Sequence, residues 1–168
     1  MDKAILEKNK IDEGFVKYSN DLFFHHLLLN NEAIRNLFCQ QLISDRKTIS
    51  TKVKNEKQYG KTYREKKLIL DLLAEDEQGV LYNVEMQAYD MTIDIVIRTQ
   101  LYGAEILRRQ IDKGNSYDGA GDVRQLIINA AKPLAGCHFY RHDFVLYDKE
   151  HDVEFPSNKI FVTVIQLK

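Results

Sequence analysis

The pattern of hydrophobic and polar positions predicts two helical regions. Residues 22–43, LFFHHLLLNNEAIRNLFCQQLI, have apolar side chains at helical spacing, and the preceding Ser-Asn-Asp supplies side chains that cap helices. Asn30 and Asn31 interrupt this pattern and favour two helices in place of one. In residues 92–114 apolar residues recur every three or four positions, which predicts a second helical region with Gly114 as its C-terminal cap.

Shorter apolar runs predict strands. Residues 47–67 are polar and rich in lysine, with a β-branched start that favours a strand and Gly60 at a turn. Residues 67–76 and 80–87 predict two strands joined around Glu-Gln-Gly, and three further strands are predicted at 123–131, 143–148 and 159–167. The expected order is therefore helix, strand, strand, strand, helix, strand, strand, strand.

Composition and charge fit one globular domain. The chain has 168 residues, of which 44% are hydrophobic and 29% charged, and it contains no internal repeat or Pro/Ser-rich linker. We expect a single domain over residues 1–168, with residues 1–18 as an N-terminal extension. The formal net charge of -1 excludes a global basic field for nucleic acid, although it leaves room for a local basic groove.

The sequence also predicts a cytoplasmic protein. Cys39 and Cys137 have no metal-binding spacing and form no disulfide framework, so reduced thiols are expected. The N-terminus has neither the basic start nor the apolar core of a signal peptide. No apolar run approaches the roughly 20 residues that cross a bilayer, so we expect no membrane partner.

Acidic residues interrupt the predicted hairpin of residues 67–87. In the second strand, Asn83, Glu85 and Gln87 share one face because strand side chains alternate. If Glu-Gln-Gly is a three-residue loop with Gly79 in the left-handed conformation, Asp71 lies opposite Glu85 on that same face. Their β-carbons would then be about 4.5–5.5 Å apart. A loop one residue shorter would put the two acids on opposite faces.

Two carboxylates at this distance repel each other, so either one is protonated or a cation lies between them. Oxygen ligands in this arrangement suit Mg²⁺ or Mn²⁺, with water and a substrate phosphate completing the coordination. The alternative from the residues alone is structural. Asp71 would then lie at a sheet edge or pair with a lysine such as Lys66 or Lys67.

The arrangement D…E-x-Q on adjacent strands resembles the PD-(D/E)XK nuclease superfamily, in the variant where glutamine replaces the lysine. The chain more narrowly resembles the recombination-promoting nuclease / putative transposase group. The resemblance extends from about residue 19 through SNDLFFHHLL, LDLLAEDEQGVLYNVEMQ, IRTQLYGAEILRRQIDKGNSY and IFVTVIQLK. It implies an α/β fold, namely a restriction-endonuclease-like mixed β-sheet flanked by helices. It also implies Mg²⁺- or Mn²⁺-dependent cleavage of double-stranded DNA.

The resemblance assigns roles by position. Asp71 and Glu85 would be metal ligands, with the Met86 carbonyl as a third. Gln87 would orient the attacking water or the scissile phosphate. Asp21 matches the acidic position of an opening D-x-x-F pattern, which leaves two interpretations open: an approach to the metal through water, or a helix cap.

Basic residues flank the predicted site and are candidates for contacts with DNA phosphates. They comprise Lys61, Arg64, Lys66 and Lys67 before the hairpin, and Arg98, Arg108 and Arg109 after it. A solvated helix face and a charged loop are the alternative interpretation. The sequence also leaves open a homodimer, in which a second copy of the chain is the partner.

The chain departs from the superfamily pattern in two ways. It lacks the lysine, and a neutral glutamine is neither a cation nor an ordinary proton acceptor. It also stops at Lys168, whereas relatives usually continue, which leaves open a missing C-terminal region.

Other function classes stay open beside the nuclease. One is a catalytically inactive DNA-binding or protein-interaction module with the nuclease fold, and another is a hydrolase acting on a small phosphoester. A zinc site at Cys137, His138 and His142 is a weaker candidate, because zinc normally needs three or four convergent ligands.

Overall fold

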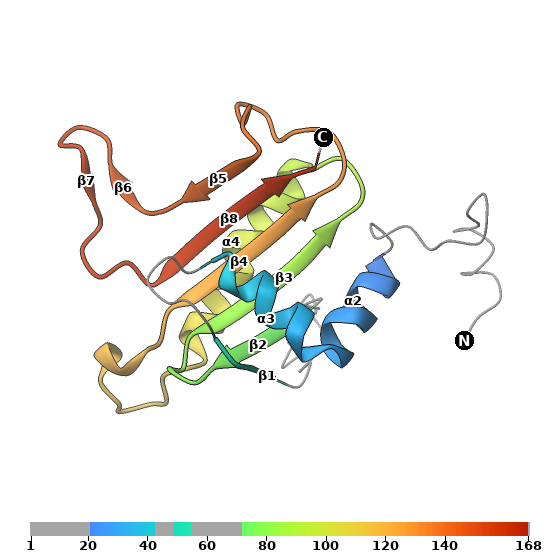
Figure 1. The fold of residues 1–168 in the computed structure, drawn as a ribbon. Helices are drawn as coiled ribbons and strands as arrows, with labels where there is room; N and C mark the ends of the chain where they lie inside the picture. The colour runs from blue at the N-terminus through green and yellow to red at the C-terminus, as the bar shows by residue number, and fades with distance from the viewer. Residues whose placement is uncertain (1–20, 43–48, 55–71, 168) are drawn as a thin grey trace, which may run out of the picture.

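A central mixed sheet dominates the part of the chain that the computed structural model describes, residues 21–42, 49–54 and 72–167 (Figure 1). Its strand order is β1-β2-β3-β4-β8-β5. These strands span Thr51–Val53 (β1), Leu72–Asp76 (β2), Leu81–Gln87 (β3), Val123–Asn129 (β4), Ile160–Gln166 (β8) and Arg141–Phe144 (β5). A separate two-stranded ribbon joins Tyr147–Asp148 (β6) to Val153–Glu154 (β7).

The sheet combines antiparallel and parallel pairs. Strands β1, β2 and β3 run antiparallel, whereas β3, β4 and β8 are parallel neighbours, and β5 returns antiparallel at the edge. A parallel pair needs a crossover connection, and the helix α4 (Ile93–Arg108) supplies it between β3 and β4. The predicted mixed sheet flanked by helices is confirmed.

Helices cover both faces of the sheet. The helices α2 (Asp21–Asn30) and α3 (Glu32–Gln40) pack on one face, while α4 packs on the other (Figure 1). The larger core cluster lies under α2 and α3, and its fully buried members include Leu28, Leu72, Tyr82, Val84 and Leu126. A smaller cluster under α4 contains Leu73, Leu81, Tyr102, Ile106 and Val123.

The break between α2 and α3 follows the sequence prediction. Asn31 has an extended backbone, and its side chain accepts a hydrogen bond from the Ile34 amide at 3.1 Å. An asparagine in this conformation is a favoured N-cap, because it satisfies an amide that the first helical turn leaves unpaired. The proposed caps at Ser19 and Asn20 lie outside the described residues.

The hairpin between β2 and β3 has the predicted register. Glu75 pairs with Leu81 and Leu72 pairs with Val84, while the Asp76 amide donates to the Val80 carbonyl at 3.1 Å. Gly79 has a φ of 79°, the left-handed conformation that a three-residue loop requires. The prediction of Asp71 opposite Glu85 follows from this register, but Asp71 itself lies outside the described residues.

Two boundaries differ from the sequence prediction. The helix α4 ends at Arg108, so Gly114 is not its cap; the side chain of Gln110 instead exchanges hydrogen bonds with the backbone of Gly121, which ties the helix end to the strand that follows. A short 3-10 helix, Tyr117–Gly119, lies in this connection. The strand predicted at 143–148 is divided, because its first part pairs with β8 and its second part pairs with β7.

Helix α4 buries a face that its apolar pattern does not indicate. Ile93, Ile97 and Leu101 belong to the stripe that predicts the helix, yet they are 71%, 47% and 56% exposed. The buried face instead comprises Thr99, Tyr102, Gly103 and Ile106. The physical reason is the sheet beneath α4, which presents the polar side chains of Asn83, Glu85 and Gln125 beside its apolar ones.

In the described part of the chain, no helix combines the length and apolar character needed to span a membrane.

Candidate metal and phosphodiester site

The candidate site is built on one face of β3. Because side chains alternate along a strand, Asn83, Glu85 and Gln87 project toward the α4 side of the sheet. Asn83 is 2% exposed and Glu85 is 5% exposed, whereas Gln87 at the strand end is half-buried. Tyr82 projects to the opposite face and is fully buried in the core.

Glu85 is a buried carboxylate that two different groups approach. Its Oε1 accepts a hydrogen bond from Asn83 Nδ2 at 3.1 Å, and its Oε2 lies 3.3 Å from Arg98 Nη2 on α4. The side chain of Glu85 is 6% exposed and that of Arg98 is 42% exposed. A buried carboxylate is costly unless it is paired or hydrogen-bonded. The site therefore attracts positive charge at Glu85.

Asn83 extends this polar layer to the neighbouring strand β4. Its Nδ2 also lies 3.4 Å from Oε1 of Gln125, a side chain that is 1% exposed. Asn83 Oδ1 and Gln125 Nε2 are buried without a hydrogen-bond partner in the described part of the molecule. Unsatisfied polar atoms of this kind are uncommon in protein interiors, and they keep the layer around Glu85 polar.

The other predicted metal ligands differ in what the structure shows of them. Asp71 lies outside the described residues. Met86 places its side chain in the core on the opposite face of β3, so that only its backbone could serve the site. Asp21 is the first residue of α2, a position at which an acidic side chain interacts favourably with the helix dipole.

The described residues fit a divalent ion in part. Glu85 provides a hard oxygen donor in a polar, mostly water-excluded layer, and Gln87 provides an amide oxygen close by on the same face. No group of three or more histidine, cysteine, aspartate or glutamate side chains that could hold a metal occurs among the described residues. A divalent ion at Glu85 would need a second carboxylate, and the hairpin register predicts Asp71 for this position.

Comparison with protein families identifies the chain. Residues 19–168 match the family described as PD-(D/E)XK nuclease family transposase. The chain belongs to this family. Membership supports a nuclease-type function and suggests DNA as the substrate. No curated protein and no solved structure matches the chain.

The PD-(D/E)XK fold accounts for the position of the site. Its mixed, helix-flanked sheet is the one described above, and the acidic hairpin lies where a parallel and an antiparallel pair meet on β3. The resemblance predicts that Gln87 takes the place of the superfamily's lysine. On α4, Arg98 provides a positive charge beside Glu85.

The predicted DNA-contacting residues divide into three groups. Lys61, Arg64, Lys66 and Lys67 lie outside the described residues. Arg98 lies in the site. Arg108 and Arg109 converge on Glu105, at 2.8 Å and 2.6 Å, about two turns further along α4. The sequence predicts Arg98 as a phosphate contact, which stays a prediction, but it does not indicate the pairing with Glu85, because nothing in the spacing shows how α4 is rotated on the sheet.

A hollow lies at the strand ends beside Gln87. It is lined by residues 88–90 and 130–133 and has a volume of about 730 Å³. The Gln87 carbonyl accepts from the Ala130 amide at 2.9 Å, while the Asp90 carboxylate lies 3.3 Å from Lys132 Nζ. The carboxyl ends of parallel strands commonly border ligand sites, and this hollow lies at such ends, next to Gln87 in the chain.

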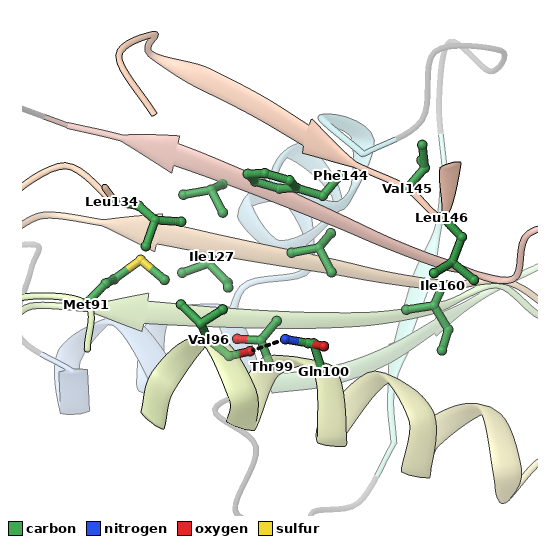
Figure 2. A pocket seen from close by; sticks show the side chains of 12 residues that line it. Met91, Val96, Thr99, Gln100, Ile127, Leu134, Phe144, Val145, Leu146 and Ile160 are labelled. Atoms are coloured by element: carbon green, nitrogen blue, oxygen red, sulfur yellow. Dashed lines mark hydrogen bonds between the residues drawn. The ribbon is translucent and has the colours of Figure 1, made fainter. Parts of the chain in front are cut away.

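A second hollow on the α4 side is apolar. This groove of about 410 Å³ lies between α4 and strands β4, β8 and β5, and Figure 2 shows Val96, Ile127 and Phe144 lining it. Its polar lining residues are Thr99 and Gln100, each of which bonds back to its own helix. Such a lining offers few donors for phosphate, so the groove does not favour a small phosphoester as substrate.

The candidate zinc ligands do not converge in the structure. Cys137 is buried, His138 is exposed, and His142 Nε2 accepts from the Phe139 amide at 3.1 Å. These residues are not part of any metal-binding group within the described ranges.

Proposed function

We propose that this PD-(D/E)XK protein is a divalent-metal-dependent DNA endonuclease that hydrolyses phosphodiester bonds. The observation that carries the proposal is the buried Glu85 carboxylate, held on the polar face of β3 and drawing a cation to it. Family membership supports the nuclease class, and the metal and the endonucleolytic mode are the proposal.

In this proposal Asp71 and Glu85 hold Mg²⁺ or Mn²⁺, with the Met86 carbonyl as a third ligand and Asp21 approaching through water. A divalent ion supplies Lewis-acid stabilisation of the charge on the phosphate and favours ionisation of water. Asn83 fixes the rotamer of Glu85 through its 3.1 Å hydrogen bond, so that one carboxylate oxygen faces the site. Gln87 orients the attacking water or the phosphate through its amide, which can both donate and accept.

The neutral side chain at position 87 has a mechanistic consequence. Without a lysine, no side chain at this position can stabilise the transition state by charge, so catalysis depends on the metal and on Arg98. Double-stranded DNA is the expected substrate. Lys61, Arg64, Lys66 and Lys67, together with Arg108 and Arg109, stay predicted contacts to its backbone.

The test is cleavage of supercoiled plasmid by the purified protein in Mg²⁺, Mn²⁺, Ca²⁺ or EDTA. Nicking or linearisation in Mg²⁺ or Mn²⁺ is expected, and it should be lost in EDTA, in Glu85→Gln and in Asp71→Asn. Glu105→Gln is the matched control, because it removes an Arg-paired carboxylate elsewhere on the α4 side. Equal cleavage by Glu85→Gln and the wild type would overturn the assignment.

One observation favours a second function, a catalytically inactive DNA-binding or protein-interaction module. Arg98 already neutralises Glu85 without a metal, and Gln87 replaces the superfamily's basic residue. Calorimetric titration with Mn²⁺ distinguishes the two functions. A nuclease binds Mn²⁺ in a manner that depends on Glu85 and Asp71, whereas an inactive module shows no such binding.

A further inference from the structure

Arg98 has two unlike environments on its two sides. Its Nη2 reaches the buried Glu85 carboxylate at 3.3 Å, and its guanidinium lies 5.7 Å from the centre of the Tyr102 ring. The side chain as a whole is nevertheless 42% exposed. The guanidinium is therefore anchored on one side by the site and open to solvent on the other.

The donors of Arg98 are mostly unused. A guanidinium has five N–H groups, and the hydrogen bond of Arg98 in the described part of the molecule is the one to Glu85. Its Nε is buried and has no acceptor there. The capacity for an acceptor that arrives from outside lies in the other N–H groups of this partly exposed side chain.

The other arginines of α4 pair with a carboxylate outside the candidate site. Arg109 donates through Nε, and Arg108 donates through both Nε and Nη2, to the single carboxylate of Glu105, with distances of 2.6–2.9 Å. These contacts are shorter than that of Arg98, and Glu105 is more exposed than Glu85. The α4 arginines thus divide into two that pair with Glu105 and one that lies beside Glu85.

The negative charge of the Glu85 carboxylate can attract either Arg98 or a metal ion. A divalent ion on this carboxylate and the Arg98 guanidinium would compete for the same negative charge, because both are cations within a few ångströms of it. A phosphate oxygen pair is the acceptor that matches a guanidinium fork, and arginine is favoured over lysine where bidentate recognition is needed.

We propose that Arg98 is the phosphate-binding residue of the candidate site, and that it neutralises the Glu85 carboxylate until a divalent ion takes that carboxylate. The inference rests on the proposed function, because it needs Glu85 to be a metal ligand. In this proposal Arg98, a residue of α4, supplies the positive charge that the neutral Gln87 does not. When the metal ion binds Glu85 and the phosphate enters the site, Arg98 exchanges the Glu85 carboxylate for the phosphate.

The first experiment measures metal binding without DNA. Mn²⁺ is titrated calorimetrically into the wild type, Arg98→Gln, Arg98→Lys and Glu85→Gln, with Lys113→Gln, an exposed position just after α4, as the control for loss of one positive charge. Arg98→Gln should bind Mn²⁺ about three- to ten-fold more tightly, the range expected when one partly exposed ion pair no longer competes. Arg98→Lys should lie between Arg98→Gln and the wild type, and Lys113→Gln should match the wild type.

The second experiment measures phosphate binding. A short labelled DNA duplex is titrated in Ca²⁺ at several salt concentrations, and its fluorescence anisotropy is followed. Arg98→Gln should weaken binding and reduce the salt slope by about 1, the change expected for one lost phosphate contact. A purely structural Arg98 would leave the slope unchanged. Circular dichroism checks folding, and Arg98→Lys decides the outcome if Arg98→Gln does not fold.

The possible failures are distinguishable. If Mn²⁺ binding requires Glu85 but is equal in Arg98→Gln and the wild type, the inference is wrong while the proposed function stands. An unchanged salt slope in Arg98→Gln overturns the phosphate role in the same way. If no Mn²⁺ binding depends on Glu85, the proposed metal site and the inference are both wrong.

Discussion

Gly103 on α4 lies directly against the side-chain amide of Gln125 on β4. A β-carbon added at position 103 would come within 2.6 Å of Gln125 Nε2 and 3.0 Å of Ile160 Cγ2. Gln125 in turn approaches Asn83, which holds Glu85. The absent side chain at Gly103 therefore allows α4 to approach the polar layer of the candidate site closely.

This contact predicts that Gly103→Ala destabilises the protein, although alanine is the better helix former by about 1 kcal/mol. The added methyl group must displace a buried amide, and such overpacking typically costs about 1–3 kcal/mol. Chemical denaturation measures the change in free energy of unfolding. Ala104→Gly, at the neighbouring exposed position, is the control for propensity alone. A more stable Gly103→Ala would contradict the close approach.

Asp76 holds the turn that sets the hairpin register. Its Oδ1 accepts from the amides of Gln78 and Val80 at 2.8 Å and 3.0 Å, and its Oδ2 accepts from the Tyr82 hydroxyl at 2.8 Å. Asp76→Ala should lower the free energy of unfolding by about 2–4 kcal/mol, because the carboxylate is buried and its partners lose an ionised acceptor.

Thermal or urea unfolding checks the Asp76 prediction. Glu77→Gln is the matched control, since Glu77 is exposed, and it should change stability by about 0.5 kcal/mol or less. A loss below about 1 kcal/mol in Asp76→Ala would show that the turn does not depend on this carboxylate.

The pairing of Glu105 with Arg108 and Arg109 on α4 is expected to contribute to the stability of the protein in a pH-dependent way. The hydrogen bond from Arg108, followed by that from Arg109, lowers the pKa of Glu105 from 4.5 to about 2, although partial burial opposes the shift. Because the folded-state pKa is depressed, the stabilisation is fully present above pH 4.5 and is lost as the pH falls through about 2.

The measurement compares the wild type with Glu105→Gln across that range. Since Arg108 is 59% exposed, solvent screens the pair and the expected difference is about 1 kcal/mol at neutral pH. The two stability curves should converge near pH 2. A difference that stays constant from neutral pH to pH 2 would contradict the assignment.

Cys39 is expected to be chemically inert in the folded protein. It is 0% exposed, and burial raises the pKa of its thiol from 9.0 to about 12, although the charge of Arg35 works in the opposite direction. The thiolate is the reactive form, so Ellman's reagent should not react with Cys39 at mildly alkaline pH until the protein unfolds. Cys137→Ser isolates the signal, and rapid reaction of this variant under native conditions would overturn the prediction.

The local sequence was sufficient where chain geometry alone decides the structure. The helix break at Asn31 follows from capping chemistry, and the hairpin register follows from a three-residue loop with Gly79 in the left-handed conformation. In β3 the alternation of side chains places Asn83 and Glu85 on one face whatever packs above them. These are short-range constraints, so a reader of the sequence can apply them directly.

Tertiary structure decided which groups meet across elements. The apolar stripe of α4 correctly predicted a helix but not its buried face, because the rotation of a helix depends on the surface beneath it. Gly103 can approach Gln125, and Arg98 reaches Glu85, only in that rotation. The sequence by itself thus determined the fold class and the acidic face of β3. The cation beside Glu85 was decided by packing between residues far apart in the chain, which no local pattern encodes.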